Sequence, residues 1–291
     1  MSSYRFQQVD VFTDRPFYGN PVAVVLEAND ISDEEMQRIA AWTNLSETTF
    51  VQRPTVAEAD YRLRIFTPAG ELRFAGHPTV GSAHAILESG VATARDGVMR
   101  QECGAGVLKL TVEAEEQRRI YVEAPEAKFV REHHGLWKGL GEALGHPIGE
   151  WAAPTSFDNG PVWLFARFDD AADIGSLEPD MPALTSLCRE QSVTGVAAFA
   201  LPEGSGPRVR IRCFAPAVGV PEDPVTGSAN AALPAYLAHH GMLAPIKREY
   251  VATQGTEMGR DGRVFVRVLD ARGRTEIGGH SVTAIEGEIR L

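Results

Sequence analysis

The chain has 291 residues, of which 44% are hydrophobic and 23% charged, and its formal net charge at pH 7 is −11. This length fits one large domain or two of about 150 residues, each able to bury a core. The acidic charge disfavours nucleic acid and anionic membranes as partners, although a small anionic substrate can still bind a locally positive site. No apolar run approaches the roughly 20 residues that a membrane span needs.

The cysteines indicate the compartment. Cys103, Cys188 and Cys213 are odd in number, form no Cys-x-x-Cys motif and have no histidine at ligand spacing. They therefore predict neither a disulfide framework nor a metal site. Because the first residues also lack a signal-peptide core, we expect a cytoplasmic protein.

The first 122 residues are expected to be rich in strands. Ser32 and Glu35 form a capping box that opens a helix ending near residue 43, and Gly90 is placed to end a second helix. Alternating apolar and polar residues predict the strands. The expected elements are strands at 4–12, 22–26, 47–52, 61–66, 98–102, 107–112 and 119–122, and helices at 32–43 and 78–88.

The remainder, residues 123–291, resembles the first half and begins with a linker at residues 123–126. Pro234 falls within an expected helix and should kink it, because proline removes a backbone hydrogen bond. We predict two domains, 1–122 and 123–291, with the last strand free to cross back to the first. The expected elements are helices near 136–144, 181–190 and after 226, and strands at 197–201, 208–214, Tyr250, Val264 and Val282.

A repeated motif relates the two halves. Residues 77–85 read His-Pro-Thr-Val-Gly-Ser-Ala-His-Ala, residues 223–231 read Asp-Pro-Val-Thr-Gly-Ser-Ala-Asn-Ala, and a Phe-x-Pro-Ala precedes each copy. The repeat predicts a duplicated α+β fold. Each β-rich half would wrap around one central helix, and a single active site would lie in the cleft between the halves.

The repeated Gly-Ser-Ala residues predict a site for a carboxylate, because small residues at a helix start leave N–H groups pointing outward. Tight packing of a helix on a sheet is the alternative. At equivalent positions the copies carry His77 and Asp223. His77 could hold an anion or pass a proton near neutral pH, or simply bind a backbone carbonyl. Asp223, which precedes a proline, could equally be an N-cap.

Two further residues need interpretation. Glu47 lies between Ser46 and Thr48 at a strand start, where it either points into a cleft or is an ordinary exposed residue. Cys103 is followed by Gly-Ala-Gly and an alternating strand, so no helix N-terminus is available to lower the pKa of its thiol. We expect Cys103 to be an inert hairpin residue.

Four motifs, in order along the chain, resemble those of the phenazine-biosynthesis PhzF-like isomerase family, which has the diaminopimelate-epimerase fold. The resemblance covers essentially the whole chain. The motifs are Val9-Asp-Val-Phe12 with Gly19-Asn-Pro-Val-Ala-Val-Val25, Asn44-Leu-Ser-Glu-Thr48, Phe74-Ala-Gly-His-Pro-Thr79, and Glu222-Asp-Pro-Val-Thr-Gly-Ser-Ala229. Each motif is weak alone, but the four together are specific.

The resemblance implies that Glu47 is the catalytic carboxylate and works beside His77, and it makes Asp223 a third catalytic candidate. Epimerases of this fold use two cysteines, whereas this chain has Ala75 and Asp223 near those places. No cofactor or metal is implied, and a homodimer is possible. The implied substrate-binding residues are Asn20, Ser46, Gly76, Thr226, Gly227 and Ser228.

The expected reaction is a proton transfer that shifts a double bond on a small unsaturated or cyclic carboxylic acid. Glu47 would remove a proton from one carbon and return it to another, which requires burial to raise its pKa towards neutrality. Two alternatives remain. One is an amino-acid racemase or epimerase with Glu47 and Asp223 as opposing bases, and the other is a small-molecule-binding protein that has no catalytic activity.

Overall fold

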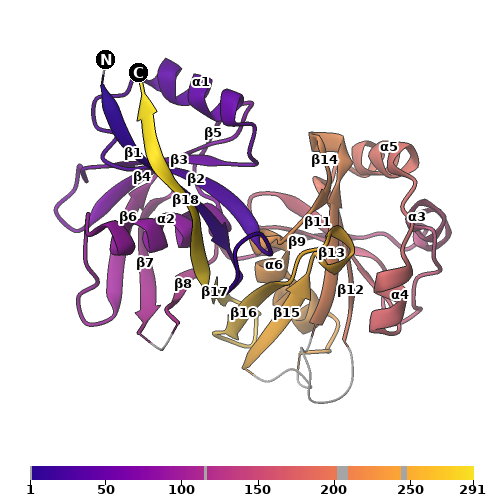
Figure 1. Ribbon diagram of the computed structural model, residues 1–291. Coiled ribbons are helices and arrows are strands. Elements are labelled where there is room, and N and C mark those ends of the chain that lie inside the picture. Colours follow the sequence, from indigo (N-terminus) through magenta and orange to yellow (C-terminus); the bar gives the residue numbers. More distant parts are fainter. Residues whose placement is uncertain (1, 115–116, 202–208, 244–247) are drawn as a thin grey trace. The chain divides into compact units, whose positions relative to one another are not determined.

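The computed structural model describes residues 2–114, 117–201, 209–243 and 248–291. Arg208, at the start of a predicted strand, lies outside these residues. The chain divides into two compact units. The first unit comprises residues 1–123 and 278–291, and the second comprises residues 124–277 (Figure 1).

The first unit is built mainly of strands. β1 pairs antiparallel with both β18 and β2, β2 runs parallel to β3, and β3 runs antiparallel to β4. β4 continues into a parallel pair with β6, and an antiparallel meander joins β6, β7 and β8. The strands are β1 (Ser3–Val11), β2 (Asn20–Val25), β3 (Thr48–Gln52), β4 (Tyr61–Phe66), β5 (Glu71–Leu72), β6 (Val98–Cys103), β7 (Gly106–Glu113), β8 (Arg119–Glu123) and β18 (Ser281–Arg290).

Helix α2 (Gly76–Ser89) is the central element of this unit. It contacts β1, β2, β3, β4, β8 and β18, so strands surround it (Figure 1). Nine of its 14 residues are buried. A helix that is buried on most sides has no polar face, which explains why its sequence consists largely of small and apolar residues. The predicted ending is confirmed, because Gly90 adopts the left-handed conformation with a φ of 71°.

Helix α1 (Asp33–Thr43) packs on the outside of the same strands. The capping box predicted for Ser32 and Glu35 is present, and Met36, Ile39 and Ala40 form the buried face. That face packs in a core cluster with residues such as Val25, Phe50 and Phe66. Asn44, in the left-handed conformation, ends the helix and turns the chain towards β3.

The second unit has its own strands and helices. β9, β10 and β11 form antiparallel pairs, β11 runs parallel to β12, and β12 runs antiparallel to β13. β13 then runs parallel to β15, which pairs antiparallel with β16. The strands are β9 (Lys128–Glu132), β10 (Thr155–Asp158), β11 (Val162–Arg167), β12 (Gly195–Ala200), β13 (Val209–Ala215), β14 (Val220–Asp223), β15 (Glu249–Gln254), β16 (Gly262–Val268) and β17 (Thr275–Gly279), the last of which ends in the first unit.

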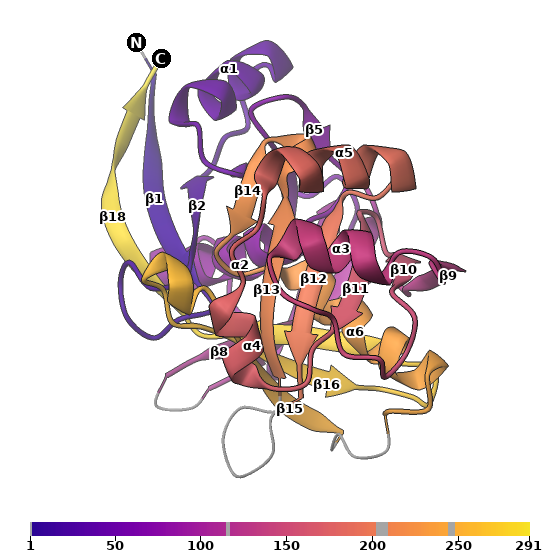
Figure 2. The ribbon, with the colours of Figure 1, turned by 90° about the vertical axis from the view of Figure 1, so that its right-hand side faces the viewer.

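Two groups of helices cover the strands of the second unit. Helix α6 (Gly227–His239) is buried and contacts β9, β10, β11 and β16. The helices α3 (Trp137–Leu144), α4 (Ala171–Ser176) and α5 (Met181–Gln191) close a separate core that includes Leu164, Phe168 and Phe214 (Figure 2). Pro234 lies inside α6, yet the helix continues to His239.

The predicted class and the two β-rich halves around a buried helix are confirmed. Cys103 lies in the β6–β7 hairpin opposite Gly106, as expected. One helix start was predicted wrongly, because α2 begins two residues before Pro78, whereas α6 begins after residue 226 as expected. The short elements β5, β9, β10, β14, β17 and α4 were not predicted. Among the residues described, no helix combines the length and the apolar character needed to cross a membrane.

Candidate active site

Glu47 stands at the junction between α1 and β3. Its carbonyl oxygen accepts a hydrogen bond from the amide of Ala23 at 3.4 Å, which continues the parallel pairing of β2 and β3 back to this residue. The next residue, Thr48, bonds the hydroxyl of Thr43 at the end of α1 at 2.7 Å. These contacts fix the backbone on both sides of the Glu47 carboxyl group.

The carboxyl group of Glu47 lies against His77. Glu47 Oε2 is 3.2 Å from His77 Nε2, and the two side chains are only 15% and 9% exposed. Burial raises the pKa of Glu47 to about 7, because a carboxylate loses hydration there, although a hydrogen bond from the Ser46 side chain opposes the shift. Two residues that the sequence separated by 30 positions therefore form a buried acid–base pair within the first unit.

Buried hydroxyl and amide groups hold α2 in place beside this pair. Thr49 Oγ1 lies 3.1 Å from the carbonyl of Ala23 and 2.8 Å from Ser82 Oγ, so β2, β3 and α2 meet at one hydrogen-bonded point. Gln101 bonds Thr79 Oγ1 at 3.1 Å and the hydroxyl of Tyr61 at 3.0 Å. All of these groups are buried, so their bonds are costly to break and define the position of His77.

Three other predicted residues, Asn20, Ser46 and Gly76, belong to the first unit. Asn20 is buried and begins β2, opposite Val11. Gly76 is the first residue of α2, directly before His77. Ser46 is exposed and bonds the Glu47 carboxylate. The structure thus brings Ser46, Glu47 and His77 together, while the roles given to Asn20 and Gly76 stay predictions.

In the second unit, Gln254 organises the loop before α6. Its side-chain oxygen accepts from the amide of Thr226 at 2.9 Å, and its Nε2 lies 2.8 Å from both the carbonyl of Asp223 and Thr226 Oγ1. Thr226 Oγ1 in turn donates to the Asp223 carboxylate at 2.7 Å. The N-cap of α6 is Thr226, so the alternative that Asp223 is the N-cap is wrong. Asp223 instead ends β14 with its carboxylate held by this network.

Ser228 is the second residue of α6 and is bound from two sides. Its Oγ accepts a hydrogen bond from the indole Nε1 of Trp163 at 2.9 Å, and its carbonyl accepts one from Asn159 Nδ2 at 2.9 Å. Accepting the indole bond leaves the hydroxyl hydrogen to donate elsewhere. Gly227, Ser228 and the buried Thr226 therefore form a polar helix start with defined orientation.

The two copies of the repeat have different structures, contrary to the expectation of two equivalent helix starts. Gly227 begins α6, whereas Gly81, the matching residue, lies inside α2. A Cβ on Gly81 would come within 2.6 Å of side-chain atoms of Val11 and Val22. In the first copy, therefore, close packing explains the glycine.

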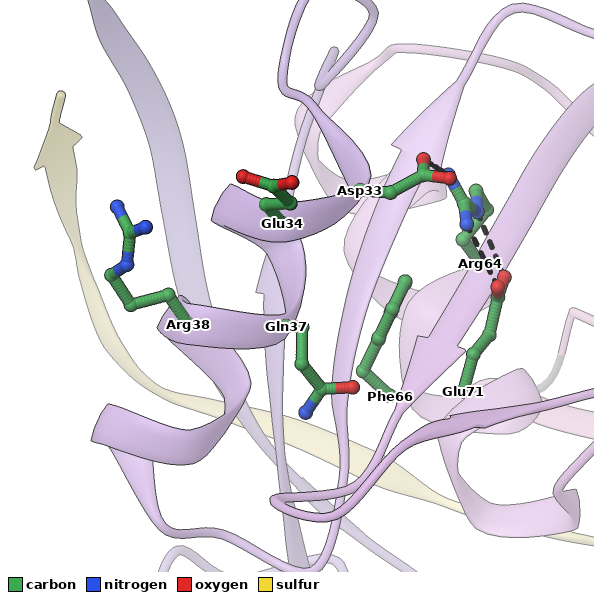
Figure 3. A pocket seen from close by; sticks show the side chains of 7 residues that line it. All are labelled: Asp33, Glu34, Gln37, Arg38, Arg64, Phe66 and Glu71. Carbon is green, nitrogen blue, oxygen red and sulfur yellow. Dashed lines mark hydrogen bonds and ion pairs between the residues drawn. The ribbon is translucent and has the colours of Figure 1, made fainter.

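A shallow groove in the first unit, about 550 Å³ in volume, contains none of the predicted site residues. It is lined by Asp33, Glu34, Gln37, Arg38, Arg64, Phe66 and Glu71 (Figure 3). The Arg64 guanidinium is bound by Asp33 and by Glu71, the latter at 2.7 and 2.8 Å. These two carboxylates hold the Arg64 guanidinium in place.

Comparison with known proteins establishes both the fold and the family. A probable proline racemase from Agrobacterium radiobacter superposes with a TM-score of 0.68 over 99% of this chain and 93% of its own. The two sequences are only 14% identical, so this likeness concerns the fold alone. A PhzF-family phenazine biosynthesis protein from Bacillus anthracis, 26% identical, superposes with a TM-score of 0.88 over the whole of both chains. The protein thus has the duplicated epimerase-like α+β fold.

Sequence comparison identifies the family. Residues 9–287 match the model of the phenazine biosynthesis-like protein family, PhzC-PhzF, so the chain belongs to this family. A relative from Pseudomonas aeruginosa named trans-2,3-dihydro-3-hydroxyanthranilate isomerase is 35% identical over 99% of this chain and 100% of its own. Another, antisense-enhancing sequence 1 of Schizosaccharomyces pombe, is 38% identical over 99% of each chain.

Proposed function

We propose that this protein is an isomerase that moves a proton and a double bond within a small unsaturated or cyclic carboxylic acid, with Glu47 as the group that transfers the proton. The main support is the buried carboxyl group of Glu47, which lies 3.2 Å from His77. Burial raises the pKa of Glu47 to about 7. A group with a pKa near the working pH is both an effective base and an effective acid.

The proposed reaction follows from this pKa. The Glu47 carboxylate removes a proton from an allylic carbon: a C–H bond breaks, an O–H bond forms, and the electron pair spreads over the unsaturated acid. The resulting carboxylic acid then returns the proton to a different carbon of the same system. Glu47 ends the cycle as it began, and no electrons leave the substrate. His77 Nε2, beside the carboxylate, stabilises the proton on Glu47 or the negative charge that develops on the substrate.

We assign substrate binding to Asn20, Ser46, Gly76, Thr226, Gly227 and Ser228, and a polarising role to Asp223. In the second unit, the support is a helix start of small residues whose amides suit a carboxylate. The hydroxyl hydrogen of Ser228 adds a further donor, because its oxygen already accepts from Trp163. A homodimer and a cytoplasmic location also remain predictions.

The test is proton NMR in deuterated water. Trans-2,3-dihydro-3-hydroxyanthranilate, the compound in the name of the Pseudomonas aeruginosa relative, is the first substrate to try, followed by other unsaturated acids and by α-amino acids. We expect deuterium uptake together with a shifted double bond. Deuterium uptake at an α-carbon with loss of optical purity would indicate a racemase instead. Binding without exchange across the panel would contradict an enzymatic role.

A further inference from the structure

A cluster of histidines and one glutamate lies in the second unit, away from the residues discussed so far. Glu132 is the last residue of β9, His239 is the last residue of α6, and His240 is the C-cap of that helix. One potential ligand atom from each of these residues lies within 4.8 Å of the other two. His239 Nε2 is 2.9 Å from Glu132 Oε1, and His134 Nε2 approaches the other oxygen, Oε2, at 3.0 Å.

The hydrogen bonds of His240 set its tautomer. Thr155 Oγ1 lies 2.7 Å from the carbonyl of Ala153, to which it donates its only hydrogen, and 2.9 Å from His240 Nε2. Nε2 of His240 must therefore carry the hydrogen and donate it to Thr155. The other ring nitrogen, Nδ1, keeps its lone pair. A histidine that donates one N–H to an oxygen and offers the other nitrogen is the usual arrangement of a metal ligand.

The surroundings also favour a cation and fix the rings. The C-terminal end of a helix carries partial negative charge, and α6 ends at this cluster, where Glu132 adds a carboxylate. The ring of His239 stacks on Phe129, with centroids 4.7 Å apart, and the ring of His240 lies 4.5 Å from that of Tyr236. Glu132 and Thr155 are paired across β9 and β10, so the carboxylate and the partner of His240 share one rigid ladder.

We propose that Glu132, His239 and His240 form a binding site for a divalent transition-metal ion such as Zn²⁺, with His134 orienting the carboxylate. Two histidines and a carboxylate are a common ligand set for Zn²⁺. Ligand atoms at about 2.1 Å from a tetrahedral ion are roughly 3.4 Å apart, so the ligand atoms of the cluster, which lie within 4.8 Å of one another, have to draw closer to hold the metal. The ion would join the end of α6 to β9 and stabilise the second unit.

The test is calorimetric titration of metal-free, tag-free full-length protein with Zn²⁺ as its chloride. We expect one equivalent to bind per chain, and we expect H239Q and H240Q each to weaken binding by at least tenfold. T155V keeps the shape of the side chain but removes the acceptor for His240, so affinity should fall by about 10–100-fold. H146Q is the matched control, because His146 faces a single carboxylate, Asp173, at 3.6 Å.

Two results would overturn the proposal: no binding of Zn²⁺, or binding that is equally tight in H239Q and H240Q. Thermal melting of each metal-free variant by circular dichroism checks folding. Thr155 is fully buried, so T155V could fail to fold, whereas the His239 side chain is 33% exposed and H239Q should fold normally. If T155V fails to fold, the affinity of H239Q for Zn²⁺ decides the outcome. The result is independent of the proposed isomerase activity.

Discussion

Nε2 of His77 lies 3.2 Å from Oε2 of Glu47, although one residue belongs to a buried helix and the other precedes a strand. The contact depends on the packing of α2 against β3, and it places a titratable pair where water has little access. Burial raises the pKa of Glu47 to about 7, and this shift has consequences for both stability and activity.

The stability of the protein should fall as pH rises from the pKa of Glu47 in the unfolded chain to its raised pKa in the folded chain. In the unfolded chain its pKa is near 4.5, and in the folded chain it is about 7, so between these values the folded state binds more protons. This contribution to stability is fully present below pH 4.5 and is lost as pH rises through 7. The stability lost between pH 5 and pH 8 amounts to roughly 2–3 kcal/mol.

Urea unfolding at pH 5 and pH 8 measures this contribution. In E47Q the side chain cannot titrate, so the difference between the two pH values should shrink by that amount relative to the wild type. E34Q, on the exposed face of α1, is the control and should leave the difference unchanged. An identical pH dependence in E47Q and wild type would mean that the pKa of Glu47 is not raised.

The bond between Thr49 and Ser82 predicts an asymmetric response to mutation. Thr49 Oγ1 donates to the carbonyl of Ala23, so Ser82 must donate to Thr49. T49V leaves the buried Ser82 donor without its acceptor and should cost about 1–3 kcal/mol. S82A leaves the Thr49–Ala23 bond intact and should cost less, about 1 kcal/mol.

Denaturant unfolding of the single and double variants checks this order. The double variant T49V/S82A should be less destabilised than the sum of the two single changes, because no lone hydroxyl donor remains. A larger loss for S82A than for T49V would show that the direction of the bond is the reverse.

Gly81 should tolerate no side chain. The Cβ atom of G81A would lie 2.6 Å from branched side chains that are fully buried, Val11 and Val22. Overpacking of this kind costs about 1–3 kcal/mol. Gly139 in α3 is the matched control, because it is helical and its Cβ would meet nothing within 4 Å. G139A should be stabilised by about 0.5–1 kcal/mol. Equal effects of G81A and G139A on the melting temperature would rule out this explanation of the repeat.

Gln254 should stabilise the connection between β14, which ends at Asp223, and α6. Q254M keeps a similar volume but leaves the buried amide of Thr226 without its acceptor, so we expect a loss of about 1–3 kcal/mol. The same change at an exposed position, Q117M, provides a control for the substitution itself. A Q254M variant as stable as wild type would show that the loop does not depend on this side chain.

The sequence predicted local structure well where local signals exist. The capping box of Ser32 and Glu35, the glycine end of α2 and the strand over residues 61–66 all follow from short-range patterns. The alternative that Asp223 is the N-cap of α6 was wrong, although Asp-Pro is a common helix opening. Here Asp223 ends β14, and Gln254 binds its backbone carbonyl.

The candidate site was only partly accessible from the sequence. Glu47 taken alone was an unremarkable residue at a strand start, and the family motif singled it out. Its burial and its contact with His77 depend on how distant elements pack. The supporting side chains Thr49, Gln101 and Gln254 were missed. Gln101 and Gln254 are polar residues within strands and are buried in the structure. Their polar side chains at strand positions were the one signal that the sequence offered.

The central claim, that Glu47 transfers the proton, is tested most directly by the rate of double-bond migration in E47Q and E34Q. We would follow trans-2,3-dihydro-3-hydroxyanthranilate by proton NMR in deuterated water. Loss of a general acid–base should lower kcat of E47Q by about 10²–10⁴-fold while KM changes little, with E34Q like wild type. Near-normal turnover by E47Q, with deuterium still entering the product, would contradict the role proposed for Glu47.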